Sequence, residues 1–283
     1  MPLVSVIVPA FRSGATIAAS VASLERQTFR DFEVVVVESG GDTNARELPV
    51  RWIGTAGRLF PQAARNLGVD HARGELLAFT DPDIYLDPHW LERLVAAWRA
   101  RGGVIVGAFA QHGSRWTDTG FHFCKFSKWL PGAPPCAVDM APSGNMLLAR
   151  ADFERAGRFP GELFVGDVEL SRRLRELGVP LWFEPAAIGA HHHLYGVAEF
   201  LRERFTRGRL YGELRREWYR RRPVRRLVLL AATVLPIRLA RNIALVASHA
   251  ARSRRTAAFL TSLPIILLGY TATLTGEARG LAR

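Results

Sequence analysis

Cysteine is scarce in this chain of 283 residues, which contains only Cys124 and Cys136. Two cysteines cannot build a disulfide framework or a four-cysteine zinc site, and their spacing matches no redox motif. We therefore expect a reducing compartment. The opening sequence MPLVSVIVPA also lacks the basic segment and the long apolar segment of a cleaved secretory signal, so we do not expect export by such a signal.

No glycine-rich phosphate loop of either common nucleotide type follows the apolar runs of the first half of the chain. This absence disfavours a dinucleotide-dependent oxidoreductase and a P-loop enzyme. The composition is otherwise that of an ordinary folded protein, since 48% of the residues are hydrophobic and 23% are charged. The chain is long enough for one large domain or two small ones.

Most of the chain has no excess of positive charge, although the net charge of the whole chain is +12. Residues 1–198 carry 20 Lys and Arg against 21 Asp and Glu, whereas residues 199–255 carry 16 against 4. A protein that binds nucleic acid through a generally basic surface is therefore the least favoured class. We expect two domains with different roles, residues 1–198 and an Arg-rich helical region at 199–283.

Residues 1–198 alternate between strand and helix patterns. Short β-branched or apolar runs at 4–8, 32–37 and 76–80 predict strands, and the segments at 17–26, 61–71 and 87–101 have helical spacing. This order predicts an α/β fold with a doubly wound, mostly parallel sheet. Such sheets bind ligands beyond the carboxyl ends of their strands. We interpret the aromatic residues between 116 and 129 as core rather than as a platform for sugar stacking.

Polar residues follow each of the three predicted strands. They are Pro9-Ala10-Phe11, then the segment from Glu38 to Asp42, then Asp81-Pro82-Asp83. Alternate carboxylates after a strand can hold Mg²⁺ or Mn²⁺ together with substrate phosphates. A Thr-Asp-Pro-Asp sequence is also a common turn, and taken in isolation this segment favours the turn.

Two further segments carry candidate site residues. Of the three adjacent histidines His191, His192 and His193, at most one can face a given ion, and a solvated turn is the alternative. Asp167 begins a predicted amphipathic helix, where the exposed amide groups explain an acid and also keep it ionised. An ionised carboxylate in that place could act as a general base.

Taken together, these segments resemble the family 2 glycosyltransferases. The resemblance rests on VSVIVPAFRSGATIAASVASLERQTFRDFEVVVVES, AARNLGVDHARGELLAFTDPDIYLDPHWLERLV, SGNMLLARADFERAGRFPGELFVGDVELSRRLRELG and FEPAAIGAHHH, in that order. It covers most of residues 3–193. It implies the GT-A fold, nucleotide-diphospho-sugars as sugar donors and inversion at the anomeric carbon.

The resemblance also implies roles for individual residues. Sugar-donor contacts fall on Pro9, Ala10, Phe11, Glu38, Asp42, Arg65, Asn66 and Asp81, the metal on Asp83 and His191, and the acceptor base on Asp167. Two positions depart from the family pattern. Glu38-Ser39 replaces a pair that is usually Asp-Asp or Asp-Asn, which leaves the nucleotide base undetermined, and Gly166 stands where a glutamate is usual.

The region after residue 198 predicts contact with a membrane. Its arginines suit anionic head groups or the phosphate of a lipid-linked acceptor, with a solvated basic helix packed on the catalytic domain as the alternative. Residues 238–252 have the pattern of an interfacial amphipathic helix, and residues 256–276 contain no charge. A span or a re-entrant hairpin is favoured for the last segment, over a buried helix pair. Arginines before it predict a catalytic domain on the cytoplasmic face of the membrane, with a purely cytoplasmic protein as the alternative.

The combined prediction is a metal-dependent inverting glycosyltransferase that acts on a cell-envelope glycan or a lipid-linked acceptor. One alternative is a soluble glycosyltransferase with a small or protein acceptor. Another, from a different class, is a non-catalytic protein that binds a sugar nucleotide. The sequence does not determine the sugar, the linkage or the oligomeric state.

Overall fold

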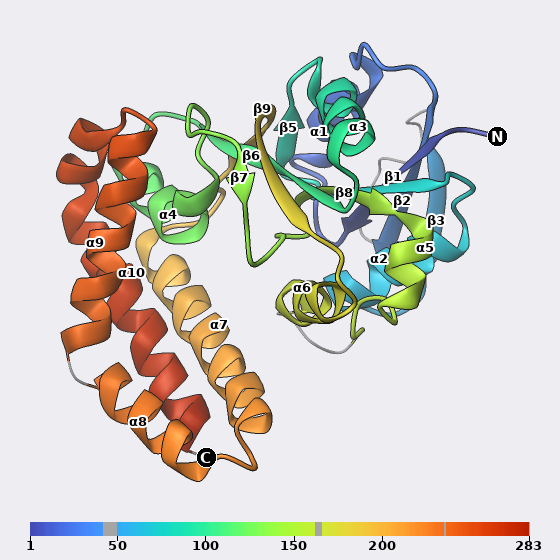
Figure 1. The fold of residues 1–283 in the computed structure, drawn as a ribbon. Helices are drawn as coiled ribbons and strands as arrows, with labels where there is room; N and C mark the ends of the chain where they lie inside the picture. Colours follow the sequence, from blue (N-terminus) through green and yellow to red (C-terminus); the bar gives the residue numbers. More distant parts are fainter. Residues whose placement is uncertain (42–49, 162–165, 235, 283) are drawn as a thin grey trace. The chain divides into compact units, whose positions relative to one another are not determined.

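The computed structural model describes residues 1–41, 50–161, 166–234 and 236–282 (Figure 1). The chain divides into two compact units. The sheet unit comprises Met1–Ala110 and Pro134–His192, and the helical unit comprises Gln111–Ala133 and His193–Arg283. The domain boundary at residue 198 stays a prediction, and the inclusion of residues 111–133 in the helical unit has no local sequence signal.

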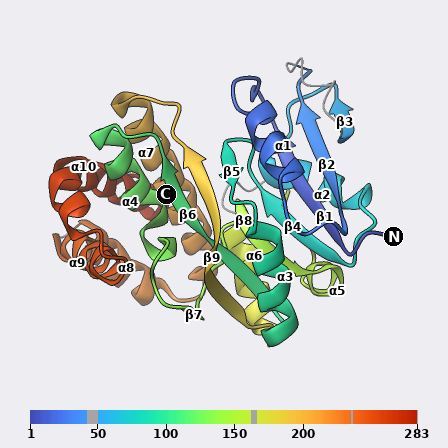
Figure 2. The same ribbon diagram turned by 90° about the horizontal axis from the view of Figure 1, so that it is seen from above.

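Within the described residues, nine strands form one sheet in the order β3-β2-β1-β4-β8-β6-β9-β5, with β7 on β9 (Figure 2). Strands β1, β2, β3 and β4 are parallel, and β8 pairs antiparallel with β4 and β6. The bounds are β1 Val4–Ala10, β2 Phe32–Ser39, β3 Arg51–Thr55, β4 Leu76–Thr80, β5 Ile84–Leu86, β6 Val104–His112, β7 Cys136–Ala137, β8 Asn145–Ala149 and β9 Leu181–His192. The predicted α/β sheet is confirmed, with an antiparallel part added to its parallel part.

The helices of the sheet unit are α1 (Ile17–Glu25), α2 (Pro61–Asp70), α3 (Trp90–Arg101), α5 (Arg150–Arg155) and α6 (Gly166–Glu176). Strand β1 is buried along its whole length, so helices cover both of its faces. The carboxyl ends of β1, β2 and β4 meet at one edge of the sheet, because these strands are parallel neighbours.

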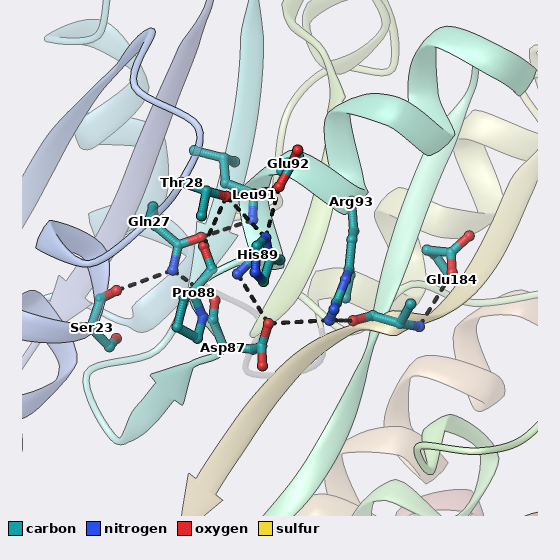
Figure 3. A network of polar contacts seen from close by, with 12 residues as sticks. Ser23, Gln27, Thr28, Asp87, Pro88, His89, Leu91, Glu92, Arg93 and Glu184 are labelled. Carbon is teal, nitrogen blue, oxygen red and sulfur yellow. Dashed lines mark hydrogen bonds and ion pairs between the residues drawn. The ribbon is translucent and has the colours of Figure 1, made fainter.

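A polar network fastens the end of α1 to the start of α3 (Figure 3). The Gln27 amide nitrogen donates to the Asp87 carbonyl at 2.8 Å, and the Gln27 amide oxygen accepts from the Leu91 N–H at 2.9 Å. The Asp87 carboxylate accepts from the His89 N–H at 3.0 Å, and α3 begins at Trp90, slightly later than the sequence predicts. The network therefore holds the segment between β5 and α3 against the end of α1.

The helical unit contains α4 (Trp116–Phe126), the 3₁₀ turn η2 (Ser127–Trp129), α7 (Val197–Trp218), α8 (Pro223–Val234), α9 (Pro236–Arg252) and α10 (Thr256–Ala282). Phe121 stacks on Phe200 with ring centroids 4.1 Å apart, and Phe123 packs in a core with Val246 and Ile266. These aromatic residues are core, as predicted, although Trp116 is exposed.

Candidate active site

The ends of β1 and β2 bring Ala10 beside Glu38, which are paired in the register of the two strands. Glu38 is 1% exposed, and its Oε2 accepts a hydrogen bond from the Trp52 indole N–H at 3.1 Å. A buried carboxylate needs such a donor to offset the loss of its hydration. Trp52 of β3 therefore fixes the orientation of Glu38, one of the residues expected at the nucleotide.

Phe11 lies directly after β1 with two arginines near its ring. The guanidinium carbon of Arg58 is 4.5 Å from the ring centroid and that of Arg12 is 5.3 Å away. A side chain at Gly40 would bring its Cβ to 3.2 Å from Phe11, and Gly40 has a φ of +97°, so glycine suits this close approach on both grounds. Pro9 and Ala10 precede this cluster within β1, and Asp42 lies outside the described residues.

Asp81 follows β4 and forms an ion pair with Arg65 of α2. Arg65 is 3% exposed, whereas Asp81 keeps 32% of its side chain exposed. The second guanidinium nitrogen of Arg65 donates to Gln62 Oε1 at 3.2 Å. The buried arginine thus holds one face of the Asp81 carboxylate and leaves another face open.

The Ser143-Gly144-Asn145 segment supports the same carboxylate from the side of β8. A Cβ at Gly144 would lie 2.6 Å from Asp81 Oδ2, so a larger residue there would displace Asp81. Asn145 is fully buried, where its oxygen accepts from Trp90 at 2.7 Å and its nitrogen donates to the Ala108 carbonyl at 2.9 Å. These contacts give a physical reason for glycine and asparagine in this segment.

Asp83 lies beside His191 because β5 and β9 pair with Ile84 opposite His191. His191 Nε2 is 3.5 Å from Asp83 Oδ2, and the backbone N–H of His192 donates to the Asp83 carbonyl at 2.8 Å. The neighbouring His192 ring instead contacts the Tyr85 hydroxyl at 3.0 Å. Of the adjacent histidines in β9, His191 is therefore the one whose ring faces the carboxylate of Asp83.

Asp83 and His191 fit a divalent cation. Two ligands at adjacent positions of an octahedral ion lie about 3 Å apart, close to the observed 3.5 Å. Burial and the charge of Asp83 raise the pKa of Tyr85, so that side chain stays a neutral phenol beside the pair. No cluster of three or more potential metal-ligating side chains occurs in the part of the chain that is described. A cation here would depend on substrate phosphate for its remaining ligands.

Asp167 stands in the first turn of α6 and is 7% exposed. Its Oδ1 accepts from the Val168 N–H at 3.0 Å, which fixes the orientation of the carboxylate. A Cβ at Gly166 would already lie 2.9 Å from Gln62 Cγ, so the backbone at the start of α6 packs against α2. Glycine in place of the glutamate usual in the family allows this approach.

Gln62 is a residue that the sequence reasoning missed. It is 3% exposed, its amide oxygen accepts from the Arg65 guanidinium, and its amide nitrogen lies 3.5 Å from Ser143 Oγ. Its position one turn before Arg65 was the only available signal. Asn66, in contrast, uses both ends of its amide on the backbone of Phe159, at 2.8 and 3.3 Å. Its contacts in this structure are therefore those of a residue that holds α2 in place.

Known proteins resemble this chain over the segments that form the sheet unit and beyond. The family model described as glycosyl transferase family 2 matches residues 5–145. The glycosyltransferase AglE of Haloferax volcanii is 27% identical over 249 residues, which cover 83% of this chain and 81% of that protein. The validoxylamine A glucosyltransferase of Streptomyces hygroscopicus subsp. jinggangensis is 27% identical over 225 residues, which cover 64% of this chain and 53% of that protein.

Solved structures are similar in fold at low sequence identity. The mannosyltransferase PcManGT from Pyrobaculum calidifontis, in complex with GDP-Man and Mn²⁺, has a TM-score of 0.57 and 19% identity, and the match covers 94% of this chain and 87% of that one. GalNAc-T7 with UDP, GalNAc and Mn²⁺ has a TM-score of 0.55 and 17% identity, covering 68% of this chain and 44% of that one. These similarities agree with the α/β sheet described above.

Proposed function

Because the chain belongs to the family 2 glycosyltransferases, we propose that it moves a sugar from a nucleotide-diphospho-sugar to a hydroxyl of a cell-envelope glycan or lipid-linked acceptor, with inversion. The observation that carries this proposal is the placement of Asp83 beside His191, next to the Arg65–Asp81 pair. Acidic side chains at one edge of a parallel sheet suit a cation and a diphosphate better than they suit an anion alone.

Residues at the ends of β1, β2 and β4 bind the sugar donor in this proposal. Pro9, Ala10, Phe11 and Glu38 face the base and ribose, and Asp81 contacts the nucleotide while Arg65 holds its carboxylate. Asp42 is assigned to the ribose on the family resemblance alone. Arg65 is ion-paired and buried, so its role is to position Asp81 rather than to bind a free phosphate.

Asp83 and His191 would hold the divalent cation, which supplies charge neutralisation for the departing diphosphate. Mn²⁺ is present in the complexes of PcManGT and GalNAc-T7, and Mg²⁺ has the same preference for carboxylate oxygen. His191 must be neutral to act as a ligand.

Asp167 acts as the general base. Oδ1 is engaged by the Val168 N–H, which orients the carboxylate and leaves Oδ2 to take the proton. The acceptor oxygen then bonds to the anomeric carbon as the bond to the diphosphate oxygen breaks, and the nucleoside diphosphate leaves with that electron pair. One displacement inverts the configuration and needs no covalent glycosyl-enzyme.

The acceptor side rests on the basic helical region. Arginines and exposed apolar side chains of α8 and α9 suit an anionic membrane, which favours a lipid-linked or envelope acceptor over a small soluble one. Nucleotide-sugars are made in the cytoplasm, so the proposed place of action is the cytoplasmic face of the membrane.

A thermal-shift titration tests the metal assignment. Wild-type protein should be stabilised by at least one of UDP, GDP or their sugars when Mn²⁺ is present, and Asp83→Ala should lose most of that metal-dependent shift. Asp152→Ala is the matched control, since Asp152 pairs with Arg155 on the surface of α5. Equal metal dependence in Asp83→Ala and wild type would remove Asp83 from the site.

Two alternatives are distinguishable by simple measurements. A non-catalytic sugar-nucleotide-binding protein would show the thermal shift but no hydrolysis or transfer of any donor with metal. A soluble glycosyltransferase with a small or protein acceptor would turn over without vesicles and would not bind them.

A further inference from the structure

Helix α8 has an inverted amphipathic pattern. Val224, Leu227 and Val228 lie on one face at helical spacing and are 72%, 64% and 64% exposed. Arg226, in contrast, points toward the rest of the helical unit, where its Nε donates to the Leu281 carbonyl at 3.0 Å. The helix thus turns its apolar stripe outward, the reverse of a helix that packs on a protein core.

Outward apolar side chains continue on the next two helices of the helical unit. We define the apolar-basic surface by the exposed large apolar residues of α8, α9 and α10, which are Val224, Leu227, Val228, Ile237, Leu245, Leu260, Leu267 and Leu268. Exposed arginines accompany them, namely Arg222, Arg225, Arg241 and Arg254. The apolar stripe of α8, with further exposed apolar side chains on α9 and α10, favours a contact surface over an ordinary solvated face.

The charge of this region selects the partner. Residues 199–255 carry 16 Lys and Arg against 4 Asp and Glu, so the apolar residues are accompanied by almost uniformly positive charge. Apolar side chains with arginines match the boundary between acyl chains and anionic head groups. A second copy of the chain would instead place positive charge against positive charge.

Helix α10 has the length and composition of a membrane span, over Thr256–Ala282. Its C-terminal half is nevertheless packed, backbone against backbone, on α7. A Cβ at Gly208 would collide with the Thr273 carbonyl, and a Cβ at Gly276 would collide with that of Phe205. Ten of the 22 residues of α7 are charged, so α7 cannot lie in hydrocarbon. The C-terminal half of α10, which packs on α7, must therefore also lie outside the hydrocarbon core.

Glu277 ties the C-terminal half of α10 to α7 and α9 through ion pairs. It is 2% exposed, and its two oxygens pair with Arg215 of α7 at 2.6 Å and Arg238 of α9 at 2.9 Å. Residues 256–272 remain, and at about 1.5 Å per residue they reach about 26 Å, short of the ~30 Å hydrocarbon core. Gly120 of α4 also packs closely on Ile265, so this half is held by the unit as well.

We propose that α10 does not cross the bilayer, and that the helical unit instead docks on an anionic membrane through the apolar-basic surface. This inference extends the membrane association of the proposed function. Its biological role rests on that function, whereas the packing that argues against a span does not depend on it. The helical unit lies in one leaflet, with α8 as its most deeply inserted helix.

Vesicle flotation of the full chain tests the docking surface. Wild type should float with vesicles of phosphatidylglycerol and phosphatidylcholine and bind vesicles of phosphatidylcholine alone at least about tenfold less well. The double variant Leu227→Glu, Val228→Glu should lose binding by about tenfold or more. Leu177→Glu is the matched control, because Leu177 is a 44% exposed apolar residue of the sheet unit. Nucleotide-dependent thermal shifts should be the same in all three proteins.

Extraction of native membranes tests the topology. Sodium carbonate at high pH should release the protein, and an impermeant maleimide should label Ala282→Cys, in a variant lacking Cys136, from the side that carries the sheet unit. Resistance to carbonate with labelling from the opposite side would establish a span and overturn the inference. If wild type does not bind the vesicles, or if it is a dimer that Leu227→Glu dissociates, the apolar-basic surface is not a membrane-docking surface. A protein that binds vesicles but no nucleotide would refute the proposed function alone.

Discussion

The sheet unit and the helical unit both pair arginine with carboxylates, but they differ in how much of the carboxylate stays accessible. In the sheet unit Arg65 is buried while Asp81 remains 32% exposed, and Asp83 beside His191 remains 30% exposed. In the helical unit the side chain of Glu277 is 3% exposed, and both of its oxygens are paired, with Arg215 and Arg238. The first arrangement leaves carboxylate oxygen for a ligand, and the second uses all of it to join helices. Exposure, rather than the pairing itself, separates a site from a structural ion cluster.

The largest effect expected in the sheet unit is on turnover. Asp167→Asn should lower the rate of transfer on the order of 10³–10⁴-fold, because the amide cannot accept the proton. The unfolding free energy and metal-dependent nucleotide binding should stay near wild type, since the amide oxygen that this substitution introduces can still accept from the Val168 N–H. The check is a transfer assay beside a thermal-shift titration, and near-normal turnover would remove Asp167 as the base.

The corresponding change in the helical unit should act on stability. Glu277→Ala should cost about 3–5 kcal/mol of unfolding free energy, because it leaves Arg215 and Arg238 without their buried partner. Glu213→Ala should cost less than about 1 kcal/mol, since its pair with Arg209 is about a third exposed. Urea unfolding measures both, and equal losses would contradict the distinction between the two kinds of pair.

Asp81→Asn should give a mixed result that places it between these extremes. We expect roughly a tenfold loss of nucleotide affinity and a stability loss of about 1–2 kcal/mol, since Arg65 keeps its hydrogen bond to Gln62. Calorimetric titration and urea unfolding measure the two quantities. A stability loss as large as that of Glu277→Ala, with nucleotide binding intact, would show that Asp81 is a structural residue.

Glu169 of α6 offers the smallest and most pH-dependent test. Hydrogen bonding from Arg172, opposed by burial and reinforced by Arg173, lowers the pKa of Glu169 below its ordinary value of 4.5. A lowered folded-state pKa contributes stability above the unfolded value, and that stability is lost as the pH falls through the folded value. Glu169→Gln should therefore cost about 1 kcal/mol at neutral pH and progressively less below about pH 4. A cost independent of pH would show that packing, not charge, is responsible.

Much of the sheet unit was predictable because its signals are local. The valine run identifies β2 as a buried strand, and the apolar run of β4 places the acids that follow it at a strand end. Strand β3 and its Trp52, the antiparallel strand β5, and Gln62 were not predicted, because their roles depend on partners distant in sequence. The contact of Asn66 with the sugar donor stays a prediction, and the structure adds the pairing of its amide with the backbone of Phe159.

In the helical unit the sequence predicted the amphipathic and apolar helices, but it did not predict how these helices pack on one another. A span or a re-entrant hairpin was favoured for residues 256–276, whereas the packing of Gly208, Gly276 and Gly120 and the ion pairs of Glu277 argue against a span. The aromatic segment 116–129 lies far from α7 and α10 in sequence and nevertheless supplies their core.

The sequence by itself determined the alternation of strands and helices, the position of the acids at the strand ends, the family, and the separation of a nearly neutral part from a basic one. These depend on side-chain period and composition, which are properties of short segments. The tertiary structure alone decided which carboxylates stay accessible and how α10 packs. Those depend on exposure and on helix contacts between segments as far apart in sequence as Gly120 and Ile265, and no local pattern encodes such pairings.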